Sequence, residues 1–408
     1  MHKIHIKLKK LVMLCMIFFL SCSTIPDTSD SDIVIPFVVE NGLIVLDAVF
    51  DGITGRFFWD TGANFSTVPG ANSRSERWYH NTVVDGERML VPFYQIDNIR
   101  FGDVDVRARS WFINIKNDFS GRVAELRGLD GMLGNSIFEG FWVELSFSRN
   151  EIVLHREMPA HFANANHVPL KSMLEISGER DDKFYLPIDI DGKEFFMLID
   201  TGAYSAFASP NDIVNYKSPD DIRRITSNAE PWDYYLVRTN SITVLDRTYL
   251  DKFVMTNSWG TTRTESITGV RGFTDIGIID TDFMRHYDFL MDYRDLFNGI
   301  TEGMFFIPIT PPEERDYGYF SFLTEVPELG ILTVWSTYRG LVITSILSDS
   351  PAYTVLGLRP GSIIAKINGE SVHNFSRAEL LDLLFTHKIT NLSVFNAEGS
   401  LELILVHN

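Results

Sequence analysis

One tetrapeptide, Asp-Thr-Gly-Ala, occurs twice in this chain and limits its possible folds more than any other feature. The copies are residues 60–63 and 200–203, and each follows an apolar run. Each also has an Asp-Gly pair nine residues upstream of its aspartate. By average residue usage, one Asp-Thr-Gly is expected by chance in about one chain in ten of this length. Two copies with the same flanks indicate a duplicated strand-and-turn unit, against the alternative of two unrelated turns.

A second pair of similar stretches extends the duplication to whole domains. One contains Gly131 and the other Gly277, and both glycines lie among hydrophobic residues. Aligning the two glycines places residues 145–147 against residues 291–293. The tetrapeptides are 140 residues apart and the glycines 146, so only six residues are inserted between the two anchors. This spacing predicts an internal repeat of a complete domain.

Most of both repeats is predicted to be β-strand, because β-branched and aromatic runs alternate with turn signals. Asp-Gly at 51–52 and at 191–192 predicts hairpin turns. A further hairpin is expected around residues 84–87, and it is either a flap over a cleft or an ordinary surface hairpin. Pro92 predicts that the expected strand 89–94 lies at the edge of its sheet. The expected strands cover 33–39, 43–50, 56–59, 89–94, 152–154, 184–190 and 195–199.

The composition excludes several classes of function. The chain has 408 residues and a formal net charge of -18, which argues against a nucleic-acid partner. Its only cysteines are Cys15 and Cys22, so no disulfide is expected in the body of the protein. The ten histidines are scattered, and no phosphate loop or Gly-x-Ser-x-Gly elbow occurs. We therefore expect neither a metal site nor a cofactor.

The N-terminus has the pattern of an export signal. Lysines precede an apolar run at 11–20, which is about half the length that a membrane span needs. The sequence Ser21-Cys22 resembles a bacterial lipobox, which implies lipidation of Cys22 and anchoring to a membrane of the bacterial cell envelope, facing the periplasm or the cell surface. The alternative is a plain secretory signal. Residues 1–22 are thus the predicted signal segment, and the polar residues 23–32 a tether.

The repeat has a chemical consequence if its halves face one another about a pseudo-two-fold axis, because Asp60 and Asp200 then meet at the centre. Two adjacent carboxylates cannot both ionise, so one keeps a proton while the other stays charged. The charged group takes a proton from a water, and the protonated group hydrogen-bonds to a substrate carbonyl. Such a pair hydrolyses amides by general acid–base catalysis without a covalent intermediate.

These motifs resemble those of aspartic peptidases, over about residues 34–305. The resemblance implies two lobes, residues 33–160 and 161–310, in a single chain that needs no dimerisation. It makes Asp60 and Asp200 the catalytic pair. The supporting loop residues would be Thr61, Gly62, Ala63, Thr201, Gly202 and Ala203. Alanine after the glycine is more similar to retropepsins than to pepsins, and it favours a milder working pH. Asp280 departs from the pattern, because the family usually has glycine there.

The C-terminal region, residues 311–408, resembles a bacterial PDZ domain, a small α/β domain. The resemblance rests on 340–346, 350–352, 357–364 and 367–370, followed by a helix predicted from Ser376 to Phe385. PDZ domains bind C-terminal peptides, and by analogy Gly340, Leu341, Val342 and Ile343 would capture the carboxylate on their backbone amides. The alternative is a structural domain that packs on the preceding lobe and binds no free ligand.

Taken together, the sequence predicts a mainly β protein: two homologous acid-protease-type lobes followed by a PDZ domain. The predicted function is an aspartic-type endopeptidase acting on peptides or unfolded proteins, with the PDZ domain holding or selecting substrate. The main alternative is a peptide-binding envelope protein that does not cut. A third possibility is a zymogen or partner-gated enzyme. Asp280 favours the binding protein, and the two intact motifs favour the enzyme.

Overall fold

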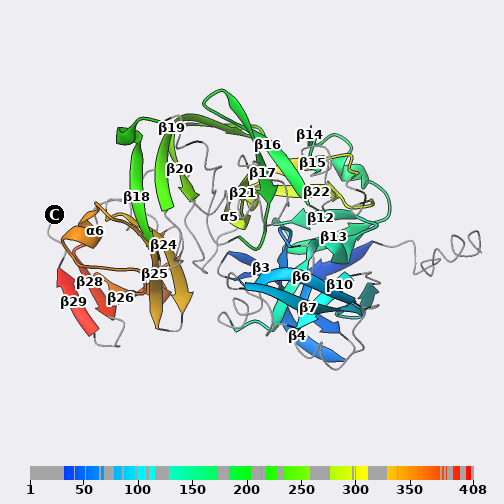
Figure 1. The fold of residues 1–408 in the computed structure, drawn as a ribbon, viewed down its shortest axis with the longest axis horizontal. Coiled ribbons are helices and arrows are strands. Elements are labelled where there is room, and N and C mark those ends of the chain that lie inside the picture. The colour runs from blue at the N-terminus through cyan, green and yellow to red at the C-terminus, as the bar shows by residue number, and fades with distance from the viewer. Residues whose placement is uncertain are drawn as a thin grey trace, which may run out of the picture. The chain divides into compact units, whose positions relative to one another are not determined.

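In the computed structural model the chain forms two compact units, residues 1–32 and 33–408. The structure describes residues 32–405 except 41, 51, 64–65, 69–77, 85–86, 97–98, 107–109, 115–127, 173–182, 204–212, 214–216, 228–233, 258–275, 296–297, 299, 311–328, 338, 377–378, 381–382, 384–388 and 396–400. The predicted signal segment, the lipidation site Cys22 and all of the tether except Asp32 lie outside the described residues. The second unit is mainly β, and those of its strands that the structure describes form three sheets (Figure 1).

The strands of the first predicted lobe follow the chain from Ile33 to His155. They are β1 (Ile33–Pro36), β2 (Val38–Glu40), β3 (Leu43–Phe50), β4 (Ile53–Asp60), β5 (Ser66–Val68), β6 (Trp78–Val84), β7 (Glu87–Ile96), β8 (Ile99–Phe101), β9 (Val104–Val106), β10 (Ser110–Asn114), β11 (Gly131–Gly134), β12 (Trp142–Ser146) and β13 (Glu151–His155). Two short 3-10 helices, η3 (Asn135–Phe138) and η4 (Ala160–Phe162), follow β11 and β13.

The described elements of the second predicted lobe follow the chain from Asn166 to Pro308. Its elements are β14 (Asn166–Val168), β15 (Lys171–Ser172), β16 (Phe184–Ile190), β17 (Lys193–Ile199), η6 (Pro219–Asp221), β18 (Ile222–Ser227), β19 (Tyr234–Val244), β20 (Arg247–Asn257), β21 (Ile276–Ile279), α5 (Thr281–Met284), β22 (Tyr287–Asp292) and β23 (Met304–Pro308). The C-terminal region adds β24 (Ile331–Thr337), β25 (Gly340–Leu347), α6 (Pro351–Thr354), β26 (Ile363–Ile367), β27 (Glu370–Ser371), η8 (Val372–Asn374), β28 (Asn391–Phe395) and β29 (Leu401–Leu405).

A six-stranded sheet joins the two halves of the repeat. Its order is β1-β13-β12-β22-β23-β14, so three strands come from each half. At its centre β12 and β22 run antiparallel, with Glu144 opposite Leu290. A single buried hydrophobic cluster extends from Ile35 in β1 to Phe306 in β23. The two halves therefore share one core as well as one sheet.

Two larger sheets lie on either side of this joint. The first follows the order β6-β7-β10-β5-β11-β4-β3-β8-β9, entirely within the first half. The second begins as β21-β17-β16-β19-β18 in the second half and continues through β25, β26, β28 and β29 of the C-terminal region (Figure 1). In each half a strand that ends at the tetrapeptide is parallel to a glycine-containing strand: β4 to β11, and β17 to β21.

Several strand predictions are confirmed at residue level. Residues 43–50 and 184–190 form β3 and β16 with the predicted bounds, and β3 pairs with β4 as a hairpin in which Phe50 lies opposite Ile53. The predicted strand 33–39 is interrupted at Phe37. The edge-strand prediction for Pro92 is wrong, because β7 pairs with β6 and also, at residues 94–96, with β10. Pro92 itself lies opposite Tyr79 of β6 and before the residues that pair with β10, so its missing amide removes no bond to β10.

The C-terminal module, which we define as residues 329–405, has a hydrophobic core of its own. Buried residues from Leu329 to Val394 form this core, separate from the one that the two halves share. Ser376 caps the start of the following segment as predicted: its Oγ accepts a bond from Glu379 N at 3.2 Å, and Glu379 Oε2 accepts one from Ser376 N at 2.7 Å. This reciprocal pair is a capping box.

The predicted carboxylate-binding stretch Gly340–Ile343 needs correction. It lies inside β25, which pairs with β24 along one edge and with β26 along the other. Ile343 N, for example, donates to Ser362 O at 2.8 Å, and a Cβ on Gly340 would lie 2.2 Å from Ile364 O. A terminal carboxylate needs unpaired backbone amides, and strand pairing on both edges engages those of this stretch. The stretch is thus structural.

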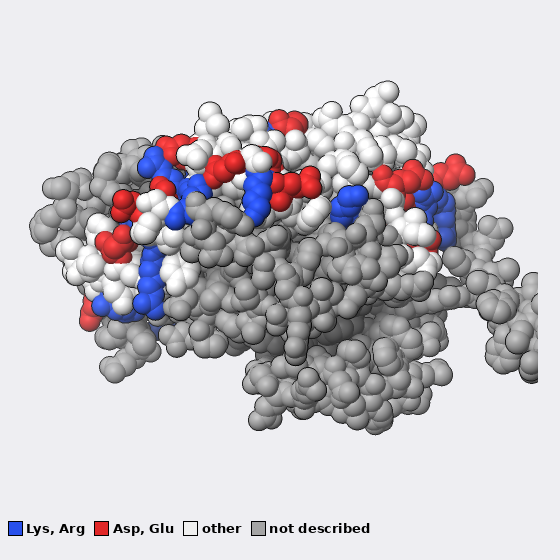
Figure 2. All heavy atoms as spheres, turned by 45° about the horizontal axis from the view of Figure 1, so that its top comes forward, with Lys and Arg blue, Asp and Glu red and all other residues white. Residues whose placement is uncertain are grey.

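The surface is charged but mixed. On the face shown in Figure 2, acidic and basic side chains of the described residues lie interspersed. Exposed pairs such as Arg238 with Asp251 and Arg223 with Asp349 are typical of this surface. Among the described residues, no helix is long and apolar enough to cross a membrane.

Candidate active site

The two tetrapeptide loops leave the sheets in the same way. β4 ends at Asp60, which lies opposite Gly134 of the parallel strand β11. β17 ends at Ile199, opposite Ile279 of the parallel strand β21, and Asp200 N donates to Ile279 O at 2.9 Å. In both halves the aspartate therefore stands where a buried strand ends beside its parallel neighbour.

The threonines of the two loops hold the loops together through crossed hydrogen bonds. Thr61 N donates to Thr201 Oγ1 at 3.1 Å, and Thr201 N donates to Thr61 Oγ1 at 3.0 Å. Each hydroxyl then donates onward to the other half: Thr61 Oγ1 to Ile199 O and Thr201 Oγ1 to Trp59 O, both at 2.6 Å. Thr61 is 1% exposed and Thr201 is 0% exposed, so no water competes for these four bonds.

The glycines bring the two carboxylates together. Gly62 N donates to Asp60 Oδ1 at 2.8 Å, and Gly202 N donates to Asp200 Oδ1 at 3.0 Å, so each amide orients the aspartate of its own loop. Each glycine also packs against the aspartate of the other loop. A Cβ on Gly62 would lie 2.5 Å from Asp200 Cγ, and a Cβ on Gly202 would lie 2.4 Å from Asp60 Cγ. Only glycine permits this close approach of each loop to the aspartate of the other.

The two alanines close the turns. Ala63 N donates to Asp60 O at 3.2 Å, and Ala203 N donates to Asp200 O at 3.3 Å. In the first half Ala63 O also accepts a bond from Asn135 N at 2.9 Å, which ties the loop to η3. Asp200 is buried and Asp60 is half-buried, so the pair lies in a partly enclosed site.

Asp280, the departure from the sequence pattern, has a structural use. Its carboxylate caps the short helix α5 by accepting a bond from Phe283 N at 3.2 Å. The equivalent residue in the first half, Gly134, precedes η3 and makes no side-chain cap. An aspartate at this position therefore satisfies a helix N-terminus and is not in itself a sign of a distorted second loop.

Sequence reasoning missed three hydroxyl groups that form hydrogen bonds next to the two loops. Ser66 Oγ accepts from Gly134 N at 2.9 Å, and Thr67 Oγ1 accepts from Met132 N at 3.2 Å. In the second half Thr281 Oγ1 donates to Thr201 O at 3.2 Å. Serine and threonine occur in strands, at helix starts and in turns alike, so nothing in the sequence distinguishes these three from others.

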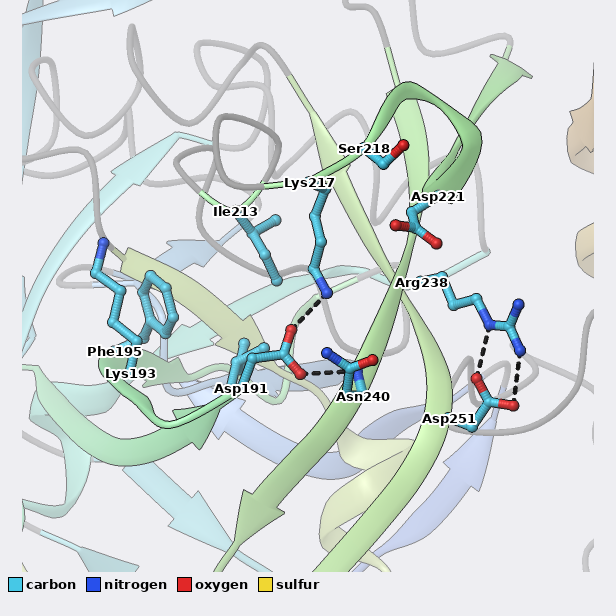
Figure 3. Close-up of a pocket in the computed structure, with 11 residues that line it drawn as sticks. Asp191, Lys193, Phe195, Ile213, Lys217, Ser218, Asp221, Arg238, Asn240 and Asp251 are labelled. Carbon is cyan, nitrogen blue, oxygen red and sulfur yellow. Dashed lines mark hydrogen bonds and ion pairs between the residues drawn. The ribbon is translucent and has the colours of Figure 1, made fainter.

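A cavity of about 570 Å³ lies elsewhere in the second half, at the turn between β16 and β17 (Figure 3). Four of its charged lining residues form two pairs: Lys217 Nζ lies 2.5 Å from Asp191 Oδ2, and Arg238 makes two bonds to Asp251. This turn and Asp200 are at opposite ends of β17, so the cavity is distinct from the aspartate pair. No group of His, Cys, Asp and Glu in the described part of the chain is arranged to hold a metal ion.

Among the solved structures, 277 chains match this one. The crystal structure of aspartic proteinase from Irpex lacteus is 11% identical, with a TM-score of 0.39, over 69% of this chain and 98% of that chain. No protein-family model and no curated protein matches the sequence. A TM-score this low does not establish a shared fold. Any function must therefore follow from the geometry of the site.

Proposed function

We propose that this protein is an aspartic-type endopeptidase whose catalytic pair is Asp60 and Asp200. The observation that carries this proposal is the crossed contact of the two loops, in which each aspartate lies against the glycine of the opposite loop. The reciprocal threonine bonds support it, because they fix both loops with buried hydrogen bonds. Such an arrangement pre-organises two carboxylates at no cost during the reaction.

The proposed mechanism follows from two carboxylates in one site. Their mutual repulsion raises the pKa of one, so the pair carries a single proton over a range of pH. The ionised carboxylate removes a proton from a water held between them as its oxygen attacks the substrate carbonyl carbon. The protonated carboxylate donates to the carbonyl oxygen. Collapse of the resulting gem-diol then protonates the leaving amine and regenerates the pair.

The loop alanines bear on the pH at which the enzyme works. A hydroxyl next to each aspartate would stabilise the ionised form, and Ala63 and Ala203 supply none. We therefore expect the pH–rate profile to peak above about pH 3. A maximum below about pH 3 is typical of a more strongly acidic pair. A maximum below that value would contradict this part of the proposal.

Cleavage of an unfolded protein and of a peptide library, read by mass spectrometry, tests the proposal. Asp60→Asn and Asp200→Asn should each abolish cleavage and leave the circular dichroism spectrum unchanged. Asp280→Asn is the matched control, because asparagine also caps helices well and Asp280 is not in the proposed pair. That variant should cut at close to the wild-type rate. Loss of cleavage in Asp280→Asn would make it a third functional carboxylate.

The same assay separates the enzyme from a protein that only binds peptides. A binding protein would retain library peptides in wild type and in Asp60→Asn alike, and it would cut none of them. Three further features remain proposals on the sequence pattern: lipidation at Cys22, a location in the bacterial envelope, and substrate selection by a PDZ-like C-terminal module. If that module captures C-terminal peptides, it does so outside Gly340–Ile343, whose backbone is engaged in the sheet.

A further inference from the structure

Two hairpins occupy equivalent places in the two halves. In β6–β7 Trp78 lies opposite Phe93, and in β18–β19 Ile222 lies opposite Val237. Both residues of the second pair are 144 positions after those of the first (222 − 78 and 237 − 93). The hairpin that the sequence marks as a possible flap therefore has a counterpart of identical register in the second half.

The outer edges of these two hairpins differ. Among the described strands, β6 is the last strand of its sheet, with no further strand beyond it. The equivalent strand β18 is covered: Ile225, Thr226 and Ser227 pair with residues 345–347 of β25 in the C-terminal module. Figure 1 shows β18 reaching from the second half to β24 and β25.

Side chains reinforce this strand pairing. Arg223 Nε and Nη2 donate to the two carboxylate oxygens of Asp349 at 3.0 and 2.8 Å. Thr226 Oγ1 lies 2.9 Å from Ser348 Oγ, and Ser348 N donates to Arg224 O at 3.1 Å. A small hydrophobic core lies across the junction, formed by Ile225, Leu236, Met255, Leu332 and Leu347. Backbone, ionic and apolar contacts thus coincide at one junction.

We propose that the C-terminal module is a positioning element that holds the hairpin β18–β19 through β25, so that this hairpin is the fixed counterpart of β6–β7. A strand whose two edges are both paired opens only when its neighbours separate, whereas an edge strand opens more easily. Where the proposed peptidase function holds, β18–β19 is the rigid hairpin of the second half, and β6–β7 is the hairpin that moves. The module then influences substrate choice through the geometry of the second half.

Hydrogen exchange on the full-length protein, read by mass spectrometry, tests directly whether the C-terminal module holds β18. We call this contact between β18 and β25 the clamp. Asp349→Arg places two cations in contact where an ion pair stood, at a site exposed enough to tolerate the change. Amide exchange in β18 and in residues 345–347 should accelerate by about five- to thirtyfold, the range that corresponds to losing one or two kcal/mol locally. The double variant Arg223→Asp/Asp349→Arg restores the opposite charges and should restore the protection.

The matched control is Asp251→Arg. It breaks an equally bidentate pair, Arg238 with Asp251 (Figure 3), in the hairpin β19–β20 and outside the pairing of β18 with β25. Exchange in β18 should stay at the wild-type rate. The clamp is overturned when Asp349→Arg leaves β18 protected as in wild type, or when Asp251→Arg exposes it to the same degree.

A kinetic readout tests the effect on the site. With a long peptide substrate, Asp349→Arg should raise KM about fivefold or more and change kcat little, because the aspartate pair itself is untouched. Equal KM values for Asp349→Arg and wild type would refute the influence on substrate. Should the protein cut no peptide at all, the proposed function fails, and the exchange experiment still decides whether the clamp exists.

Discussion

At the scale of single residues, the threonine hydroxyls carry more of the site than their size implies. Thr61 Oγ1 accepts from Thr201 N and donates to Ile199 O, so one atom satisfies two buried backbone groups of the other half. Thr61→Val keeps the shape and leaves both groups without this partner. We expect a loss of about 1–3 kcal/mol in the free energy of unfolding, measured by urea denaturation.

The matched variant Thr61→Ser retains the hydroxyl and should lose much less stability. In the peptide-cleavage assay, Thr61→Val should also lower kcat by about a hundredfold, since a small displacement of a catalytic loop costs on that order. Wild-type kcat in the valine variant would show that the crossed bonds do not position the carboxylates.

Gly62 is the other residue on which the pair depends. The Cβ of an alanine there would lie 2.5 Å from Asp200 Cγ, which no real contact permits. Gly62→Ala should therefore displace Asp200 and reduce peptide cleavage by at least about a hundredfold. Gly102→Ala provides the comparison: its φ of +57° strains the backbone, but nothing lies within 4 Å of the added carbon. That variant should cost about 1 kcal/mol of stability and keep full activity.

At the scale of elements, strand β12 lies in the middle of the shared sheet and contains a buried charged residue, Glu144. Glu144 is 0% exposed. Its Oε2 lies 2.8 Å from His155 Nε2 and 3.1 Å from His161 Nε2, and Oε1 accepts from Arg149 at 2.5 Å. Burial alone would raise the pKa of Glu144, but these hydrogen bonds and the charge of Arg149 lower it from 4.5 to about 2.

This lowered pKa predicts a specific acid sensitivity. A carboxyl group with a depressed folded-state pKa stabilises the fold fully above its unfolded value of 4.5, and the contribution is lost as the pH falls toward about 2. The shift corresponds to roughly 3 kcal/mol. Glu144→Gln should be less stable than wild type at pH 6, and the two unfolding free energies should converge by pH 2. Parallel curves in urea titrations across this range would contradict the assignment.

Local sequence signals predicted the strands whose ends are set by residues next to them in the chain. Strands β3 and β16 have the predicted bounds because an Asp-Gly turn follows each one. The pairing of β18 with β25 was not predictable in this way: it joins Ile225 to Leu347, 122 residues later, across side chains that have no distinctive pattern. The role of Gly340 was misread for the same reason, since a glycine in a buried strand and one in a binding loop look alike in sequence.

For the contact between the two tetrapeptide loops, the repeat in the sequence was a sufficient signal, because two copies of one motif at matching distances imply two equivalent loops. What the repeat left open was Asp280. Its use as the cap of α5 depends on a bond to Phe283 N, and only the backbone geometry shows that bond. Sequence patterns thus predicted which two loops meet, whereas the supporting contacts required the three-dimensional arrangement.

At the scale of the whole molecule, the two halves differ from the C-terminal module in how they are joined. The halves share a sheet and a hydrophobic core, so we expect them to open as one cooperative unit. The module has a separate core and meets the second half at a smaller cluster around Leu347. Damage to the shared core should therefore spread across both halves, whereas damage to the core of the module should stay within it.

Leu145→Ala tests this division. Leu145 is buried in β12 opposite Phe289 of β22, so its truncation should cost about 2–5 kcal/mol. Under native conditions, amide exchange in β3 of the first half and in β17 of the second should accelerate by the same factor. Leu392→Ala, at an equally buried position in β28, should accelerate exchange in β26 and β28 and leave β3 and β17 unchanged. Acceleration in β3 without β17 would mean that the shared sheet does not couple the two halves that supply the aspartates.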